Sequence, residues 1–215
     1  MRRVLAPIGL VLLLVAHLAA QQTGLTEGQI KTATLEVPEL VKLLDLQPGV
    51  TVADVGAGFG AWTMRFSKVV GPSGRVYSTD IGATQLAALR EMKEREGLTN
   101  IIVIEGAVNS SNLPALCCDA ILIRDAYHHL TQPDVIVRSL AAALKPGGRL
   151  AVIDFPPRPN SEVPSGVPPD RLGHGVPSSV VEREVGAVLT PVRTIPDWNA
   201  NSQPASLYLV LFRKP

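Results

Sequence analysis

The sequence from Val50 to Thr63 reads V-T-V-A-D-V-G-A-G-F-G-A-W-T, a short apolar run followed by three glycines and a helix-compatible segment. This order predicts a strand, a tight turn and the start of a helix, as in nucleotide-binding α/β units. Glycines at 56, 58 and 60 permit backbone angles and close approaches that a Cβ would block. We therefore expect a ligand to lie directly on this turn.

The predicted strand spans about Thr51 to Val55, and Asp54 lies at its carboxyl end, at the edge of the sheet where open α/β folds bind ligands. A carboxylate there repels phosphate but attracts an ammonium group. The glycine spacing alone fits NAD as well, since Gly56, Gly58 and Ala61 satisfy G-x-G-x-x-G/A and Asp80 stands at about the distance expected of a ribose-binding acid. The acid before the first glycine and the third glycine at 60 favour a cofactor without phosphate.

The motif D-x-G-x-G-x-G resembles the first motif of the class I S-adenosylmethionine-dependent methyltransferases. Residues 76–80 are similar to the second strand of that family with its ribose-binding acid, residues 118–130 to its fourth strand and following loop, and residues 144–150 to the turn into its fifth strand. The resemblance covers roughly residues 35 to 155 in the order that the family shows.

The resemblance implies a Rossmann-like α/β fold with helices on both faces of a mostly parallel seven-stranded sheet, closed by an antiparallel C-terminal strand. It also implies S-adenosylmethionine as cofactor and a small-molecule methyl acceptor. The cofactor contacts that it implies are Asp54, Gly56, Ala57, Gly58, Gly60, Asp80, Ile81, Ala107, Asn109 and Asp125. Asn109 stands for the adenine-binding side chain that the family usually has directly after its third strand. The alternatives are a NAD-dependent oxidoreductase and a non-catalytic cofactor-binding protein that has kept the fold.

Candidates for the chemistry follow the predicted fourth and fifth strands. Asp125 could orient the acceptor or the cofactor, or simply cap the next turn. His128, His129 and His174 could each act as a general base or have only a packing role. His174 lies in the Pro-rich stretch 156–177, which we interpret either as a lid over the acceptor or as a solvated linker. The histidines show no H-x-E or H-x-x-x-H spacing, so the sequence predicts no metal site.

Composition sets further bounds. The chain has 215 residues, 46% of them hydrophobic, which is enough for one core, and a net charge of +1 predicts no nucleic-acid partner.

Residues 1–20 have two arginines before an apolar run and predict a secretory signal, with an uncleaved membrane anchor as the alternative. Residues 21–35 are expected to form a flexible lead and residues 36–215 the methyltransferase domain. The adjacent cysteines at 117 and 118 are not expected to bridge.

Overall fold

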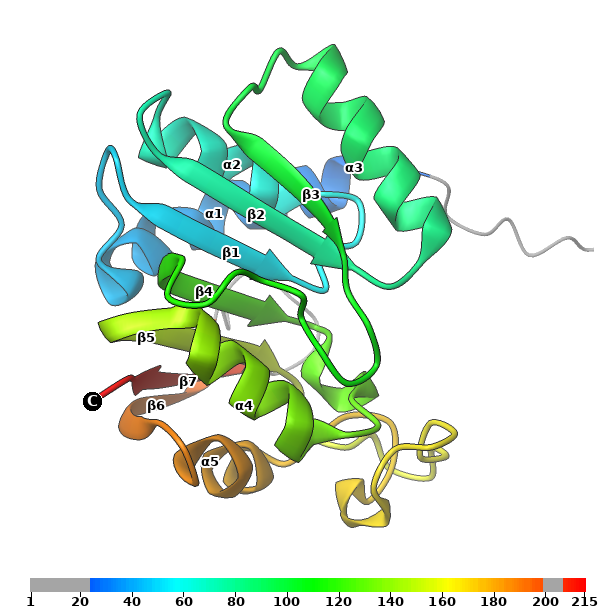
Figure 1. The fold of residues 1–215 in the computed structure, drawn as a ribbon. Coiled ribbons are helices and arrows are strands. Elements are labelled where there is room, and N and C mark those ends of the chain that lie inside the picture. The colour runs from blue at the N-terminus through cyan, green and yellow to red at the C-terminus, as the bar shows by residue number, and fades with distance from the viewer. Residues whose placement is uncertain (1–23, 199–206) are drawn as a thin grey trace, which may run out of the picture.

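A computed structural model describes residues 24–198 and 207–215, which form an α/β fold around one sheet (Figure 1). The predicted signal or anchor, residues 1–20, lies outside the described residues. No helix within the described part of the chain has the length and apolar character needed to span a membrane. The seven strands are β1 (Thr51–Val55), β2 (Arg75–Asp80), β3 (Ile101–Glu105), β4 (Cys118–Arg124), β5 (Leu144–Asp154), β6 (Thr190–Trp198) and β7 (Leu207–Arg213).

The strands follow the order β3-β2-β1-β4-β5-β7-β6. The first five are parallel to one another, and β7 runs antiparallel to both β5 and β6. This is the class I methyltransferase topology, so the predicted fold is confirmed. Because the strand order reverses direction at β1, the loops after β1 and β4 diverge and leave room for a ligand at the carboxyl edge.

Helices cover both faces of the sheet. α1 (Glu27–Leu44) and α2 (Ala61–Val70) lie on one face, and α4 (Pro133–Ala143) and α5 (Ser178–Gly186) lie on the other, in front of the sheet in Figure 1. α3 (Ala83–Arg95) contributes to the same core as α1 and α2. Two short 3-10 turns, Tyr127–His129 and Pro169–Arg171, follow β4 and β5.

Neighbouring residues of the central strands point into opposite cores, as strand geometry requires. In β1, Val52 packs with α1 and α2, while Ala53 packs with α4 and α5. In β4 the same division separates Leu122 from Ile121. Both sides of each central strand are therefore buried, which explains why these strands read as unbroken apolar runs.

The flexible lead predicted for residues 21–35 is wrong from Glu27 onward, because α1 begins there. Thr26 caps the helix: its side chain accepts a hydrogen bond from the backbone N–H of Gln29, and the Gln29 side chain accepts one from the backbone N–H of Thr26. The buried positions of α1 start at Thr32, and Pro38 lies inside the helix.

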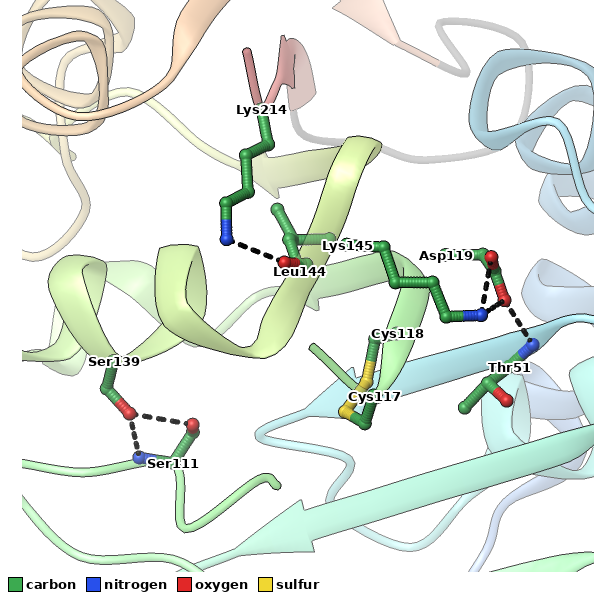
Figure 2. The surroundings of a disulfide bond; sticks show 9 residues. All are labelled: Thr51, Ser111, Cys117, Cys118, Asp119, Ser139, Leu144, Lys145 and Lys214. Carbon is green, nitrogen blue, oxygen red and sulfur yellow. Dashed lines mark hydrogen bonds and ion pairs between the residues drawn. A yellow bond between two sulfur atoms is a disulfide. The ribbon is translucent and has the colours of Figure 1, made fainter. Parts of the chain in front are cut away.

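The expectation that the two cysteines do not bridge is also wrong, since a disulfide joins Cys117 and Cys118 (Figure 2). A bridge between adjacent cysteines is sterically unfavourable in a regular strand, where successive side chains point to opposite faces. Here only Cys118 belongs to β4, and the preceding Leu116 has a left-handed φ of 52°. The irregular turn before the strand therefore allows the two side chains to meet.

α1 is fixed to the sheet by a buried ion pair. The Glu36 carboxylate, fully buried, accepts hydrogen bonds from Arg124 Nε at 2.8 Å and Nη2 at 3.1 Å, and from the indole N–H of Trp62 at 2.9 Å. The Arg124 guanidinium carbon also lies 4.0 Å from the centroid of the Trp62 ring. One carboxylate thus joins α1, α2 and the end of β4.

We expect Glu36→Ala to lower the free energy of unfolding by about 3 kcal/mol, because it leaves the Arg124 charge and the Trp62 donor without their acceptor. Urea denaturation measures the change. Glu39→Ala is the matched control on the same helix: its carboxylate is exposed and paired only with Lys42, so a change within about 0.5 kcal/mol is expected. Equal effects of the two substitutions would contradict the structural role of the pair.

Candidate functional site

The three glycines of the turn after β1 serve different purposes. All have positive φ angles, 72° at Gly56, 55° at Gly58 and 86° at Gly60. A Cβ on Gly56 would lie 2.6 Å from the Cβ of Ala126, and one on Gly60 would lie 2.7 Å from Met92 Cε, so both glycines allow close packing. A Cβ on Gly58 would meet nothing within 4 Å. Gly58 therefore faces open space, where a ligand can reach the backbone.

Two cavities meet at this turn and share Gly56, Gly58 and Asp125 in their walls. The first, of about 550 Å³, extends toward the start of α1 and is lined by Asp54, Ala57, Trp62 and Arg124 among others. The second, of about 540 Å³, extends along the carboxyl ends of β2 and β3 and is lined by Asp80, Ile81, Ala107 and His129 among others. The arrangement suits an elongated ligand that passes over the turn.

Asp54 is buried at the end of β1, with 3% of its surface exposed. Its Oδ2 accepts a hydrogen bond from the Thr63 hydroxyl at 2.6 Å. Burial raises the pKa of the Asp54 carboxyl to about 6, and the Thr63 hydrogen bonds oppose that rise. A cation in the first cavity would stabilise the ionised form.

Asp80 stands at the carboxyl end of β2, facing the second cavity. Its two carboxylate oxygens accept backbone N–H groups of Gly58 and Gly82, each at 2.9 Å. The carboxylate is thereby tied to the glycine turn, with oxygen lone pairs left for further donors. Next to it, the Ile81 side chain is 63% exposed and offers an apolar wall.

The loop after β3 differs from expectation. Ala107 lines the second cavity as predicted, together with Ser110 and Ser111, but Asn109 is exposed and does not line it. Ala107 and Ser110 form an antiparallel bridge, and this tight turn carries Asn109 away from the cavity. The predicted adenine contact of Asn109 is therefore not supported. Ser110 and Ser111 line the cavity instead, and nothing in the sequence distinguishes these two serines from other polar loop residues.

The structure brings three predicted histidines together beside the second cavity. His128 and His129 belong to the 3-10 turn after β4, and His174 comes from the loop after β5. The ring centroids lie 3.9 Å apart for His128 and His129, 4.9 Å for His128 and His174, and 5.7 Å for His129 and His174. Partial burial, followed by the neighbouring rings of His128 and His174, lowers the pKa of His129.

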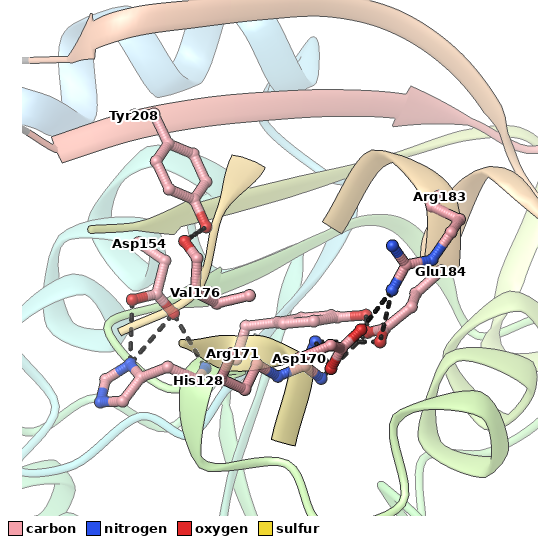
Figure 3. Close-up of polar contacts among 9 residues, drawn as sticks. His128, Asp154, Asp170, Arg171, Val176, Arg183, Glu184 and Tyr208 are labelled. Atoms are coloured by element: carbon pink, nitrogen blue, oxygen red, sulfur yellow. Dashed lines mark hydrogen bonds and ion pairs between the residues drawn. The ribbon is translucent and has the colours of Figure 1, made fainter. Parts of the chain in front are cut away.

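His128 is oriented by Asp154, a residue that the sequence analysis did not single out (Figure 3). The Nδ1 of His128 lies 2.9 Å and 3.1 Å from the two oxygens of the fully buried Asp154 carboxylate, and the His128 backbone N–H donates to Oδ2 at 3.1 Å. Since a carboxylate accepts, Nδ1 is the donor, and in the neutral imidazole this tautomer leaves the lone pair on Nε2. The sequence did contain a signal for this residue, namely an acid at the end of an apolar strand in residues 151–155, A-V-I-D-F.

Asp125 directly follows β4, has a left-handed φ of 54° and is exposed at the junction of the two cavities. Its backbone N–H donates to the carbonyl of Ile153 at 2.8 Å, which fixes the unusual conformation against β5. Non-glycine residues in this region concentrate at functional sites. The catalytic roles of Asp125 and of the histidines stay predictions.

The loop from Pro156 to Pro177 is anchored to the rest of the fold. Its Arg171 is fully buried and donates to Glu184 of α5 at 2.9 Å and 3.1 Å, and the Tyr127 hydroxyl donates to the same carboxylate at 2.8 Å (Figure 3). The backbone N–H of Arg158 donates to the carbonyl of His174 at 2.9 Å. These contacts hold His174 against the turn that carries His128.

Comparison with known families finds that residues 52–148 match the model of a methyltransferase domain. The curated relatives include ubiquinone/menaquinone biosynthesis C-methyltransferases UbiE. That of Pseudomonas paraeruginosa is 33% identical over 116 residues, which are 54% of this chain and 45% of that protein. That of Pasteurella multocida is 33% identical over 111 residues, 51% of this chain and 41% of that protein. The chain thus spans less than half the length of these relatives.

Solved structures with the same fold include a SAM-dependent methyltransferase from Aquifex aeolicus, with a TM-score of 0.62 and 24% identity over 87% of this chain and 98% of that chain. Another is phosphoethanolamine N-methyltransferase 2 of Haemonchus contortus in complex with phosphomonomethylethanolamine and S-adenosylhomocysteine. Its TM-score is 0.67 at 13% identity, covering 85% of this chain and 53% of that chain. At these identities the likeness concerns the fold.

We expect Asp54→Asn to stabilise the protein at pH 7.5 by up to about 3 kcal/mol, as measured by urea denaturation. The folded protein holds the Asp54 proton up to pH about 6, whereas the unfolded chain loses it near the ordinary pKa of 3.8. Stability therefore falls as the pH rises through this window, and the variant removes that loss. Asp134→Asn is the control, because Asp134 is exposed on α4 and pairs with Arg138. A variant less stable than the parent at pH 7.5 would contradict the prediction.

Proposed function

We propose that the chain transfers a methyl group from S-adenosylmethionine to a small-molecule acceptor. The observation that carries the proposal is the acidic glycine turn at the meeting point of two cavities, within a segment that matches the methyltransferase domain. When bound, the cofactor supplies an electrophilic methyl group on a sulfonium. The residues of the chain have to bind the cofactor, exclude water and align the acceptor.

The side chains that line the two cavities fit this cofactor. Asp54 in the first cavity matches the ammonium of the methionine part, and Asp80 in the second matches ribose hydroxyls. Ile81 and Ala107 offer apolar walls to the adenine. NAD fits less well, because its pyrophosphate would lie on the turn between the carboxylates of Asp54 and Asp125, where like charges repel.

The acceptor is proposed to approach from the side of the histidines. Asp125 lies where the two cavities join, and His129 lines the second. A base there could remove a proton from a hydroxyl, thiol or acidic carbon as the methyl is transferred. The names of the curated relatives make quinol-like and phenolic compounds the first acceptors to screen, followed by thiols and amines.

Isothermal titration calorimetry of the purified chain tests the cofactor. We expect S-adenosylmethionine and S-adenosylhomocysteine to bind with dissociation constants in the micromolar range and NAD to give no heat. Binding of NAD alone would overturn the proposal in favour of an oxidoreductase. Binding of both sulfur compounds without turnover of any acceptor would favour the non-catalytic alternative.

We expect Gly58→Val to weaken binding of S-adenosylhomocysteine at least 100-fold while the protein remains folded, because the new side chain would occupy the cavity. Gly97→Val is the matched control: Gly97 has a similar φ of 65° and also faces open space, so it carries the same backbone cost away from the cavities. Circular dichroism checks folding in both variants. Unchanged affinity in Gly58→Val would remove the turn from the site.

A further inference from the structure

Three histidine side chains in the described part of the chain lie close enough to share a metal ion. One ligand atom each from His128, His129 and His174 falls within 4.8 Å of the others. Four-coordinate zinc with Zn–N bonds of about 2.0–2.1 Å requires spacings of about 3.3 Å between nitrogens. His129 is exposed and His174 only half-buried, so both rings have room to close this difference.

The buried member of the cluster is already oriented as a ligand. Asp154 holds the Nδ1 of His128, and the second ring nitrogen points away from that carboxylate (Figure 3). A histidine whose other nitrogen donates to a carboxylate is the usual arrangement around bound zinc, since the carboxylate fixes the tautomer and strengthens the ligand. The general-base interpretation does not require a ligand atom of two further imidazoles within 4.8 Å.

The surroundings also favour a cation. The ring of Phe155 packs at centroid distances of 4.7 Å from His128 and 5.5 Å from His174, which gives the cluster an apolar wall. Two carboxylates, Asp125 and Asp154, lie within 4.8 Å of His128 measured between ligand atoms. The nearby positive charges are Arg158, whose guanidinium carbon lies 4.6 Å from the Phe155 ring centroid, and Arg124, which is already paired with Glu36.

We propose that His128, His129 and His174 bind one divalent transition-metal ion, with zinc as the preferred ion, and that Asp154 positions His128 for it. Three imidazoles and an open fourth position are the ligand set of catalytic rather than structural zinc. The open position lies beside the cofactor cavities and would take an acceptor through a hydroxyl or thiol. That last role rests on the proposed function, whereas the metal site itself does not.

The sequence predicted no metal site because its histidines lack the short, regular spacing of local zinc-binding motifs. His174 comes from the Pro-rich loop and reaches the adjacent pair only through the fold. The anchoring of that loop by Arg171 and Glu184 keeps His174 in place. The site is therefore assembled by tertiary structure rather than by a local motif.

The test uses the full chain, purified without a polyhistidine tag, treated with a chelator and kept free of reductant so that Cys117 and Cys118 stay bridged. Calorimetric titration with zinc chloride is expected to show one ion bound per chain with micromolar affinity or better. Cobalt(II) should give the intense visible absorption of a tetrahedral site. Failure to bind either ion in a defined stoichiometry would overturn the proposal.

Variants locate the ion. His129→Ala and His174→Ala should each weaken zinc binding at least tenfold, and Asp154→Asn about 10–100-fold through the loss of orientation at His128. Asp134→Asn is the control for Asp154→Asn, because Asp134 is exposed on α4 and pairs with Arg138. Zinc affinity equal to that of the parent in both His129→Ala and His174→Ala would overturn the site. Thermal melts monitored by circular dichroism confirm that each variant is folded.

The outcome is independent of the methyltransferase proposal, because zinc binding is measured without cofactor. Calorimetry with S-adenosylhomocysteine on the chelated protein then tests the cofactor alone. Zinc binding without cofactor binding would support the metal site and refute the proposed function. Cofactor binding without zinc binding would do the reverse.

Discussion

The close approach between the turn after β1 and the segment after β4 is the constraint on which the site depends. The backbone at Gly56 passes so near Ala126 that any side chain at 56 would collide with it. Because the two segments touch there, Asp125 reaches the glycine turn and separates the two cavities. Glycine at this position therefore determines where the ligand, the acid and the histidines lie relative to one another.

Three carboxylates are buried in the part of the chain that the structure describes, and each is compensated differently. Glu36 is paired with a guanidinium and an indole N–H, so its charge is satisfied within the protein. Asp154 is surrounded by the N–H groups of His128 and Phe155. Hydrogen bonds from Thr63 and the charge of Arg124 offset only part of the cost of burying Asp54, and the pKa of its carboxyl rises accordingly. This incompletely compensated carboxylate lines the first cavity, as expected if a ligand supplies the missing cation.

The sequence predicted what depends on local pattern. The apolar run before the glycines gave the bounds of β1 correctly, and the parallel strands were recognisable because both of their faces are buried. What it missed depends on contacts between distant segments. Glu36 and Asp154 read as ordinary acids until folding buries them against Arg124 and His128. The start of α1 was missed because the buried face of its first half includes polar residues such as Thr32 and Glu36, so the apolar periodicity of a helix is absent there.

The disulfide between Cys117 and Cys118 closes the shortest loop that two cysteines of one chain can form. In the chain-entropy view, a covalent link stabilises a fold in proportion to the freedom that it removes from the unfolded polypeptide, and a link between sequence neighbours removes very little. The sheet and its two cores then owe their stability to burial and not to this bond. The architecture is accordingly compatible with reducing and oxidising compartments alike.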